Sequence, residues 1–397
     1  MSAQEAAHTA QDAPDVCHDS DESARHRSAP PAIHRYTVHF SGNGQSYWPV
    51  ALKNAMLLLV TLGLFWPWAR QNTHRYVAAH THMDGVALDW QWTPRRSHAL
   101  FLAMSIGLWS MFWLRSSHPG LSWASGLFAV AVAPAWWHHA GEAKVEAPGW
   151  RGLRWRSTAK LSQSYRLWAA PLIAVTSLLG AGMVLAVLIS GGRPQRAGLI
   201  SLLTLLVGGL AMVPYMHWRI IRHQQHHLAL QHMRMRFKAH ALDLYRIWAH
   251  ATLMGAMSMT AALSLYGMLA FWAWSVLPAG ASHTWLQTMA SMAPVGLAFA
   301  ALSLVLPVSY LQTHVHNLRW SHTGCEWIRF KSYLKTREQL SMNTKHMLKL
   351  LGSAGLYWPY ASMQQLATRM QAVTIVTRVS TEQFQHQAGT VHPDHAA

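Results

Sequence analysis

Gly63-Leu64-Phe65-Trp66-Pro67-Trp68-Ala69 recurs near the other end of the chain as Gly355-Leu356-Tyr357-Trp358-Pro359-Tyr360-Ala361. Each copy closes a short apolar stretch, and a lysine precedes each at the same distance, Lys53 and Lys345. Between the copies lie three pairs of long apolar segments, which are separated by basic linkers. This arrangement predicts a multi-spanning membrane protein with internal repeats.

The composition of the 397-residue chain also favours a membrane protein. Hydrophobic residues make up 51% and charged residues 12%, whereas about 25% of the residues in a soluble domain are charged. The chain has 21 tryptophans, which favour the membrane–water interface because both their apolar ring and their N–H find suitable surroundings there. The net charge of +17 lies mainly in linkers between apolar segments, so we expect no nucleic-acid partner.

Six segments meet or approach the length of about 20 apolar residues that crosses a bilayer. They are residues 98–114, 121–138, 168–190, 197–216, 250–277 and 287–310. Short turns join the first segment to the second, the third to the fourth and the fifth to the sixth. Because a short turn makes its two helices antiparallel neighbours, we expect three transmembrane hairpins.

The linkers between these hairpins carry most of the positive charge. The intervals 69–97, 139–167, 217–246 and 311–345 hold 22 of the 32 Lys and Arg residues, whereas the three short turns hold three. Cytoplasmic loops of membrane proteins carry an excess of these residues. We therefore expect the long linkers in the cytoplasm, where anionic lipid headgroups would contact their charges.

The two repeated segments, residues 50–68 and 345–361, are shorter, and each ends in a Trp-Pro pair. They are predicted either to span the bilayer, which gives eight spans, or to form re-entrant or interfacial helices, which leaves six. Prolines also occur near the ends of other apolar segments, and proline interrupts the hydrogen bonding of a helix. We expect Pro67, Pro134, Pro214, Pro307 and Pro359 to mark a kink or an exit at the cytoplasmic boundary.

Short stretches that precede the apolar segments alternate between apolar and polar residues, as strands with one covered face do. They are residues 36–40, 88–92, 153–155, 233–237 and 327–330. We expect these strands to associate into a small cytoplasmic layer. Residues 1–32 and 382–397 are polar, with little to bury, and are predicted to be disordered tails around a membrane domain at 33–376.

Residues 54–69 run from Asn54 through Thr61-Leu62-Gly63-Leu64-Phe65-Trp66-Pro67-Trp68-Ala69, and they are followed by His74-Arg75-Tyr76 and Asp84-Gly85. Phe40-Ser41-Gly42-Asn43-Gly44 precedes them. Together these motifs resemble the signature of the YjgN-type family of bacterial inner-membrane proteins of unknown function. The resemblance is strongest over residues 34–95 and extends to about 376, with His80 in place of an asparagine. It implies the fold and the location, and it brings no assigned activity.

Histidine motifs raise the possibility of a metal site, because His138-His139, His223-x-x-His226-His227 and His314-x-His316 are closely spaced. However, the neighbouring residues are basic, and the 27 histidines are spread over the whole chain. A metal also requires three or four converging ligands. We therefore expect no metal or cofactor. Acidic residues are scarce and no nucleophile or phosphate-loop motif is present, so we expect no enzyme.

The Trp-Pro corners have two interpretations. They are either interfacial aromatic anchors or a paired gate that holds an anionic headgroup or solute, with arginine supplying charge-assisted hydrogen bonds. The candidate ligand or lipid contacts are Trp66, Pro67, Trp68, Arg70, Arg75, Tyr76, Trp358, Pro359 and Tyr360. The second corner has Ala367-Thr368 where the first has Arg75-Tyr76. A shared ligand role would therefore be asymmetric.

The sequence thus predicts an all-α polytopic protein of the bacterial inner membrane. It would have three transmembrane hairpins, two shorter terminal membrane helices and short β segments in cytoplasmic linkers. Ionisable residues at the centre of a span would indicate a transport pathway, and the predicted spans hold almost none. We expect transport, channel or lipid-handling activity. The alternative is a structural or interaction protein whose basic cytoplasmic face binds anionic lipid or a protein partner.

Overall fold

The computed structural model describes residues 33–91, 95–190, 194–230, 233–276 and 285–378. The two tails, predicted to be disordered, lie outside these residues. Most of the described chain is helical. The helices are α2 (Gly44–Val60), α3 (Trp66–Ala79), α4 (Arg95–Trp113), α5 (Pro119–Glu146), α6 (Leu161–Ser190), α7 (Pro194–His226), α8 (Ala241–Ser275), α9 (Trp285–Ser291), α10 (Ala293–Ser303), α11 (Val305–Ser321), α12 (Thr336–Gly352) and α13 (Trp358–Gln371).

Four helical segments of the described chain are long and apolar enough to cross a membrane. They are Leu161–Ile189, Gly198–His226, Ala241–Ser275 and Ala293–Ser321. Their outward surfaces are mostly exposed in the isolated chain, with only 6–22% of each apolar window buried. Exposed leucine, valine and methionine side chains cover α6, α7 and α8, and lipid is the solvent that suits such surfaces.

The partners of the three predicted hairpins pack on each other, but the count of three transmembrane hairpins is not confirmed, because the pairs differ in membrane character. In the first pair α4 packs along α5, and in the second α6 packs along α7. Neither α4 nor α5 is among the four candidate spans, so the structure supports fewer spans than the six predicted. In the third pair α8 packs against α10 and α11, which are separated by a short break at Leu304.

The prediction that Trp-Pro ends a membrane helix at residues 50–68 and 345–361 is wrong. Each segment forms a helix, a turn and a second helix, and Trp-Pro begins the second helix, as Pro67 does in α3 and Pro359 in α13. Proline suits this place because the first helical N–H groups have no partner within the helix and its fixed φ is already helical. None of these four helices is a candidate span.

The two turns have matching backbone geometry. Gly63 and Gly355 both have φ +89°, which favours glycine because a β-carbon is strained there. The Gly63 amide donates to Leu58 O and the Gly355 amide to Leu350 O, both at 2.8 Å. The hydroxyl oxygens of Thr61 and Ser353 then accept from the amides of Phe65 and Tyr357, both at 3.0 Å. The sequence similarity therefore corresponds to the same local structure.

Proline does not mark a helix exit in α5 or α7. Pro134 lies inside α5 and Pro214 inside α7, and both helices continue for several turns beyond it. A helix can retain an internal proline when neighbouring groups satisfy the freed carbonyl. One residue after the carbonyl that each proline frees, the carbonyls of Ala131 and Ala211 each accept a hydrogen bond from a tyrosine of the next helix, Tyr165 or Tyr245, at 2.9 Å, which ties the two helices together near the proline.

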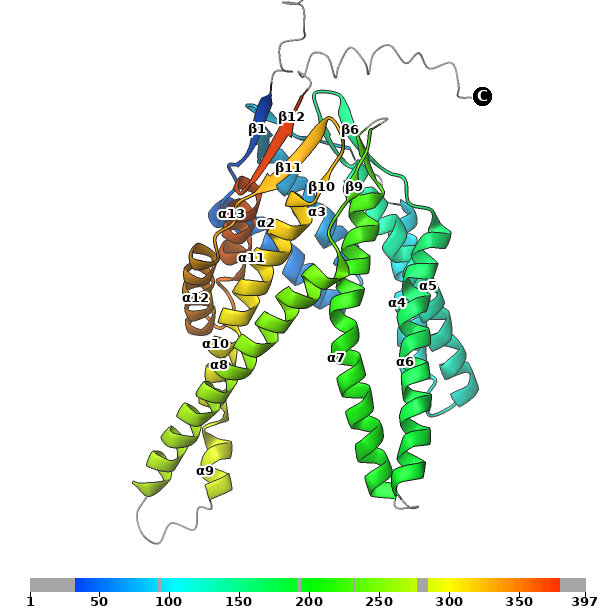
Figure 1. Cartoon of the computed structure of the whole chain (residues 1–397), viewed down its shortest axis with the longest axis vertical. Coiled ribbons are helices and arrows are strands. Elements are labelled where there is room, and N and C mark those ends of the chain that lie inside the picture. Colours follow the sequence, from blue (N-terminus) through cyan, green and yellow to red (C-terminus); the bar gives the residue numbers. More distant parts are fainter. Residues whose placement is uncertain (1–32, 92–94, 191–193, 231–232, 277–284, 379–397) are drawn as a thin grey trace, which may run out of the picture.

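The strands gather at one end of the helices (Figure 1). They are β1 (His34–Phe40), β2 (Thr81–Met83), β3 (Val86–Ala87), β4 (Asp89–Trp90), β5 (Pro148–Trp150), β6 (Leu153–Ser157), β7 (Leu228–Leu230), β8 (Met233–Arg234), β9 (Arg236–Phe237), β10 (Thr323–Gly324), β11 (Ile328–Ser332) and β12 (Val373–Thr377). Each predicted stretch overlaps a strand. They form two antiparallel sheets, with orders β3-β2-β1-β12-β11-β10-β9 and β4-β5-β6-β7-β8. The strands β2, β3, β5, β7, β10 and β12 were not predicted.

A hydrophobic core joins the two sheets. Trp150 and Leu153 of the shorter sheet pack with Ile328, Phe330 and Val373 of the longer one. The indole Nε1 of Trp150 also donates to the Met83 carbonyl at 2.9 Å, which links β5 to β2. The strands therefore form one packed layer. This layer holds together the helix ends that are predicted to face the cytoplasm.

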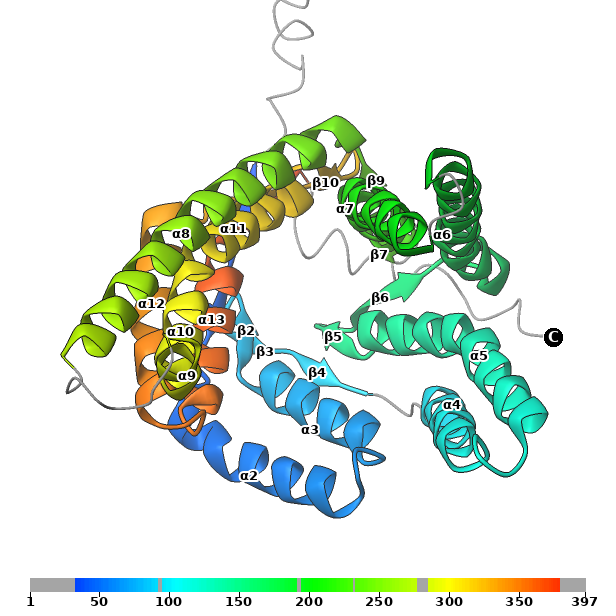
Figure 2. The same ribbon diagram turned by 90° about the horizontal axis from the view of Figure 1, so that it is seen from below.

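Seen from below, the helices surround the strands (Figure 2). Each helix or helix pair packs on its neighbour from α2 to α12, and α13 then packs back on α2. Residues 34–37 of β1 pair with residues 374–377 of β12 at the same place. The helices therefore form a closed ring, which brings residues from distant parts of the chain to one centre.

Candidate functional site

Only one of the nine predicted ligand contacts, Arg70, lies at the centre of the ring. The Arg70 guanidinium lies 5.3 Å from the ring centroid of Trp66, and its Nε donates to His74 Nε2 at 3.3 Å. Trp66 itself stacks on Phe101 of α4, with 5.5 Å between ring centroids. The first corner therefore anchors α3 to α4 and directs Arg70 inward.

The other residues of the first corner have packing roles. Pro67 is buried, and Trp68 lies against His98 with ring centroids 4.7 Å apart. Tyr76 donates its hydroxyl to the Asn43 carbonyl at 3.1 Å and so holds the turn before α2. Arg75 is exposed and lines no cavity that includes Arg70.

The residues of the second corner also make packing contacts. Pro359 is buried, and Trp358 is exposed. Tyr360 lies parallel to Tyr357, with ring centroids 5.5 Å apart, and packs on Trp48 of α2 at 6.1 Å. The two corners lie on adjacent hairpins because α13 packs on α2.

A cavity of about 390 Å³ lies at the centre of the ring, next to the strands. Residues from four helices line it, namely α3, α5, α7 and α11. Its polar and charged lining residues are Arg70, His138, Glu142, Lys144, Ser157, His223, Gln224, Gln225, His227 and Arg319, and Trp136, Trp137 and Trp320 supply aromatic walls. We call this set the central cavity.

Three cations meet at the central cavity, and each comes from a different helix. Lys144 lies close enough to Arg319 and Arg70 that their charges, added to the larger effect of burial, lower the pKa of its ammonium to about 8. The Lys144 side chain lines the cavity and keeps solvent-accessible surface, although its ammonium lies close to other protein groups. Burial also lowers the pKa of Arg70.

Arg319 is held by neutral amides. Its Nη2 donates to Gln224 Oε1 at 3.0 Å, and with the Gln225 amide turned to face it, the same nitrogen donates to the Gln225 oxygen at 2.8 Å. The guanidinium also lies 6.0 Å from the Trp320 ring centroid. Amides and π-electrons orient a cation without neutralising it, so Arg319 keeps its full charge at the cavity wall.

His74 adds a neutral ring beside these cations. Burial first, and then the charges of Lys144 and Arg70, lower the pKa of His74 to about 4. The ring is therefore uncharged at neutral pH and accepts the Arg70 hydrogen bond described above. Because His74 and Arg70 both belong to α3, this hydrogen bond orients the guanidinium of Arg70 by a contact within one helix.

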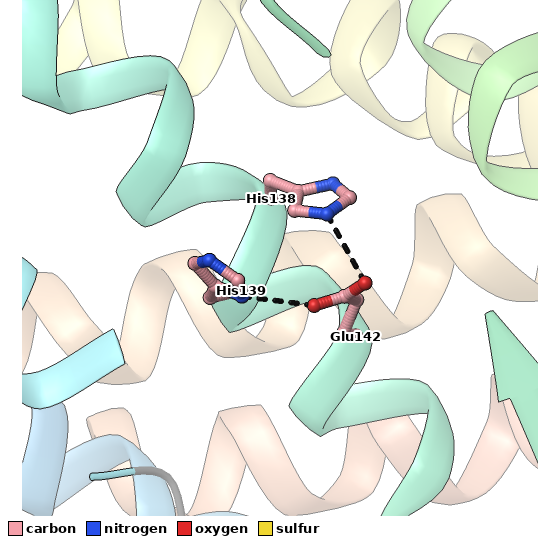
Figure 3. Close-up of side chains that lie close together, drawn as sticks. All are labelled: His138, His139 and Glu142. Atoms are coloured by element: carbon pink, nitrogen blue, oxygen red, sulfur yellow. Dashed lines mark hydrogen bonds and ion pairs between the residues drawn. The ribbon is translucent and has the colours of Figure 1, made fainter. Parts of the chain in front are cut away.

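Glu142 is the acidic residue of the central cavity, and two histidines occupy its carboxylate (Figure 3). Its Oε1 lies 3.1 Å from His138 Nε2, and its Oε2 lies 2.9 Å from His139 Nδ1. His138 Nδ1 also lies 3.0 Å from the hydroxyl of the fully buried Ser164. Glu142 thus makes its close polar contacts with histidines, and among the described residues it forms no ion pair with Arg70, Lys144 or Arg319.

His138, His139 and Glu142 are close enough to hold a metal ion, with one ligand atom each within 4.8 Å of the others. All three come from one turn of α5, and Arg70, Lys144 and Arg319 share the cavity. Positive surroundings oppose cation binding and favour an anion. His223 and His227 also approach each other, with ring centroids 4.6 Å apart, whereas His314 lies near Thr336 instead.

The family follows from a match over nearly the whole chain. Residues 35–396 match the model of a family described as bacterial protein of unknown function, DUF898. The chain belongs to this family. As a DUF898 protein with four apolar helices, it is a membrane protein.

One similar protein supports a YjgN-type relationship for this DUF898 chain. The inner membrane protein YjgN of Salmonella typhimurium is 28% identical over 105 residues, which cover 25% of this chain and 26% of that protein. The matched stretch thus spans about a quarter of the relative. No solved structure matches the chain.

The central cavity of the DUF898 protein was only partly predictable. Lys144 and Arg319 were recognised as basic linker residues, with no indication that they meet. In the structure both lie on long helices that continue beyond the apolar segments, α5 to Glu146 and α11 to Ser321. The signal that could have revealed them is the continuation of helical periodicity past Pro134 and Pro307, which turns linker charges into inward-facing helix positions.

Proposed function

We propose that this membrane protein binds an anion of the phosphate or carboxylate class in the central cavity, as part of a transport or lipid-handling activity. The observation that carries the proposal is the convergence of Arg70, Lys144 and Arg319 on one cavity whose acid, Glu142, is already paired with histidines. Three cations without an ion pair among the described residues repel one another, and a bound anion relieves that repulsion. Arginines and lysines also form the strongest hydrogen bonds to such groups.

The position of the cavity fits a binding role at the membrane boundary. It lies against the strand layer, at the end of the helices that carries the basic linkers. By the positive-inside rule this end faces the cytoplasm. The name of the YjgN relative supports placement in the inner membrane. The role we propose is binding and passage rather than catalysis.

Thermal unfolding of the purified full-length protein tests the proposal, because a ligand that binds the folded state raises its stability by about 2.7 kcal/mol at one hundred times its Kd. Inorganic phosphate, citrate and phosphatidylglycerol are compared in the same detergent. Stabilisation by the soluble anions indicates a solute, and stabilisation by the lipid alone indicates a headgroup. The Arg70→Gln and Arg319→Gln variants should lose the shift, whereas Arg75→Gln on the same helix as Arg70 should keep it.

If no anion stabilises the wild-type protein, or if Arg75→Gln abolishes the shift as completely as Arg70→Gln, the central cavity is not the anion site. Orientation is tested separately with reporter fusions. Fusions at residue 193, between the candidate spans Leu161–Ile189 and Gly198–His226, should report the outside, and fusions at residues 150 and 335 the cytoplasm. The reverse result would place the cavity at the opposite face.

A further inference from the structure

A second pocket lies between α12 and α13, away from the central cavity. Its volume is about 590 Å³, and it is open to the surface. It is lined by Arg337, Glu338, Ser341, Met342, Lys345, His346, Lys349, Tyr357 and Gln364. We call it the α12–α13 pocket. It shares no lining residue with the central cavity.

The α12–α13 pocket is strongly positive. Arg337, Lys345 and Lys349 form no ion pair with any carboxylate in the part of the chain that the structure describes. The acidic residue of the pocket, Glu338, instead binds Lys335, with 3.0 Å between Nζ and Oε1. Lys349 is oriented over Tyr357, with its Nζ 5.0 Å from the ring centroid and 3.5 Å from the hydroxyl. Such a pocket attracts an anion.

A buried histidine without a hydrogen bond forms part of the pocket wall. His346 is 4% exposed, and neither of its ring nitrogens has a hydrogen-bond partner. Its ring lies 5.7 Å from that of Tyr357, which also lines the pocket. Leaving a buried polar nitrogen unsatisfied costs about 1–3 kcal/mol, so a ligand that supplies the missing hydrogen bond gains free energy.

The first helix–turn–helix has different residues at the positions that correspond to the pocket residues. Asn54 lies at the position that corresponds to His346, and it is fully engaged: its Nδ2 donates to Ala69 O at 3.2 Å, and its Oδ1 accepts from Asn72 at 3.0 Å. Lys53 corresponds to Lys345, but Leu57 stands where Lys349 would be. The second lysine and the unpartnered histidine are therefore particular to the second copy.

The pocket lies beside a candidate membrane span. Thr336 at the start of α12 lies near His314, and Asn343 donates to Ser309 at 2.8 Å, so α12 runs antiparallel to α11 within the candidate span Ala293–Ser321. Continuing this register brings Lys345 and Lys349 alongside α10, on which α12 also packs. The large apolar residues Leu348, Leu356 and Trp358 are exposed at the same end of the hairpin.

We propose that the α12–α13 pocket binds the phosphate headgroup of an anionic phospholipid, with Lys345 and Lys349 as the charged contacts and His346 as the hydrogen-bond donor. The exposed apolar residues would then contact its acyl chains. Lipid rather than a soluble anion is favoured because the lysines and these apolar side chains lie beside a candidate span, where lysines reach toward the headgroup layer. This inference does not depend on the central cavity.

Native mass spectrometry of the full-length protein in detergent tests the inference. Phosphatidylglycerol and phosphatidylcholine with identical acyl chains are added at equal concentrations, and the retained adducts are counted. We expect one phosphatidylglycerol to be retained in preference. The Lys345→Gln/Lys349→Gln double variant should lower its retention on the order of tenfold, since each basic residue contributes measurably to anionic-lipid binding. Lys53→Gln is the matched control and should leave retention unchanged.

Three results would overturn the inference: equal retention of both lipids, unchanged retention in the double variant, or displacement of phosphatidylglycerol by millimolar inorganic phosphate, which would assign the pocket to a soluble anion. His346→Asn, which introduces the residue found at position 54, provides a second readout. It should weaken retention while the thermal shift at the central cavity persists. If the double variant does not fold, His346→Asn decides by itself.

Discussion

Gly44, at the start of α2, packs directly against Tyr360, at the start of α13, so closely that a β-carbon at position 44 would collide with the ring and the Cα of Tyr360. This contact joins the first helix of the ring to the last. Because it involves backbone as well as a side chain, neither partner can move aside without shifting a helix.

Gly44→Ala should therefore destabilise the protein by about 1–3 kcal/mol, the usual cost of inserting an extra methyl group into a packed contact. Thermal unfolding in detergent measures the effect. Gly352→Ala is the control, since Gly352 also lies in the helix–turn–helix region and a β-carbon there meets no atom within 4 Å. Equal stability of the two variants would mean that α2 and α13 are not packed this closely.

The two Trp-Pro turns should respond alike to substitution. Gly63→Ala and Gly355→Ala each place a β-carbon at φ +89°, and forcing a non-glycine residue into this region costs about 1–2 kcal/mol. No neighbouring atom contributes, because both positions face open space. Unfolding temperatures of the two variants should fall by similar amounts, and a fall in only one of them would show that the turns are not equivalent.

Lys144 should oppose folding at neutral pH. Its pKa of about 8 lies below the ordinary value of 10.5, so the unfolded chain binds the proton more tightly than the folded protein does. Its contribution to stability therefore rises as the pH increases from 8 to 10.5. Lys144→Met should raise the unfolding temperature at pH 7 and flatten this rise, as thermal scans at pH 7 and pH 9.5 would detect. A less stable variant at pH 7 would contradict the prediction.

Anion binding at the central cavity should depend on the same proton. As the pH passes 8, Lys144 loses its charge while Arg70 and Arg319 keep theirs, so affinity should fall without vanishing. Titration with phosphate at pH 7 and pH 9 measures the change. Lys144→Arg keeps the charge and should remove the pH dependence. If the variant and the wild type lose affinity equally, another group titrates.

Trp150 should be the most sensitive position of the strand layer. Its side chain is 8% exposed, packs edge-on against Tyr36 at 5.8 Å and donates to Met83 O. Trp150→Ala should cost about 3–5 kcal/mol, and Trp150→Phe should cost less because it loses mainly the hydrogen bond. Trp327→Ala, at a position 47% exposed, is the control. Denaturant unfolding should rank the three in that order.

Local features of the fold were predictable where a short sequence determines the structure. The alternation at residues 36–40 predicted β1, and the short turns predicted the α4–α5 and α6–α7 pairs. The signal failed at the Trp-Pro pairs, because a proline after an apolar run is compatible with the end of one helix or with the first turn of the next. Gly63, three residues before Trp66, is the feature of the sequence that indicates a turn between two helices.

The central cavity was less predictable because it depends on distant contacts. Arg70 was identified from its place beside an aromatic corner, whereas Lys144 and Arg319 meet it only after the ring has closed. Nothing near either residue in the sequence distinguishes it from the exposed basic residues of the linkers. The number of Lys and Arg residues in each linker predicted which side of the membrane these residues face. Tertiary packing determines which of them line the central cavity.

The pairing of β1 with β12 also constrains biosynthesis. β2 follows β1 closely and can cover one of its edges early, but the other edge stays open until residues 373–377 leave the ribosome. All four candidate spans of the described chain are made in that interval. Completion of the ring therefore waits until residues 373–377 have been synthesised, and a nascent chain interrupted before residue 373 exposes an unpaired strand edge that quality-control proteases and aggregation can both exploit.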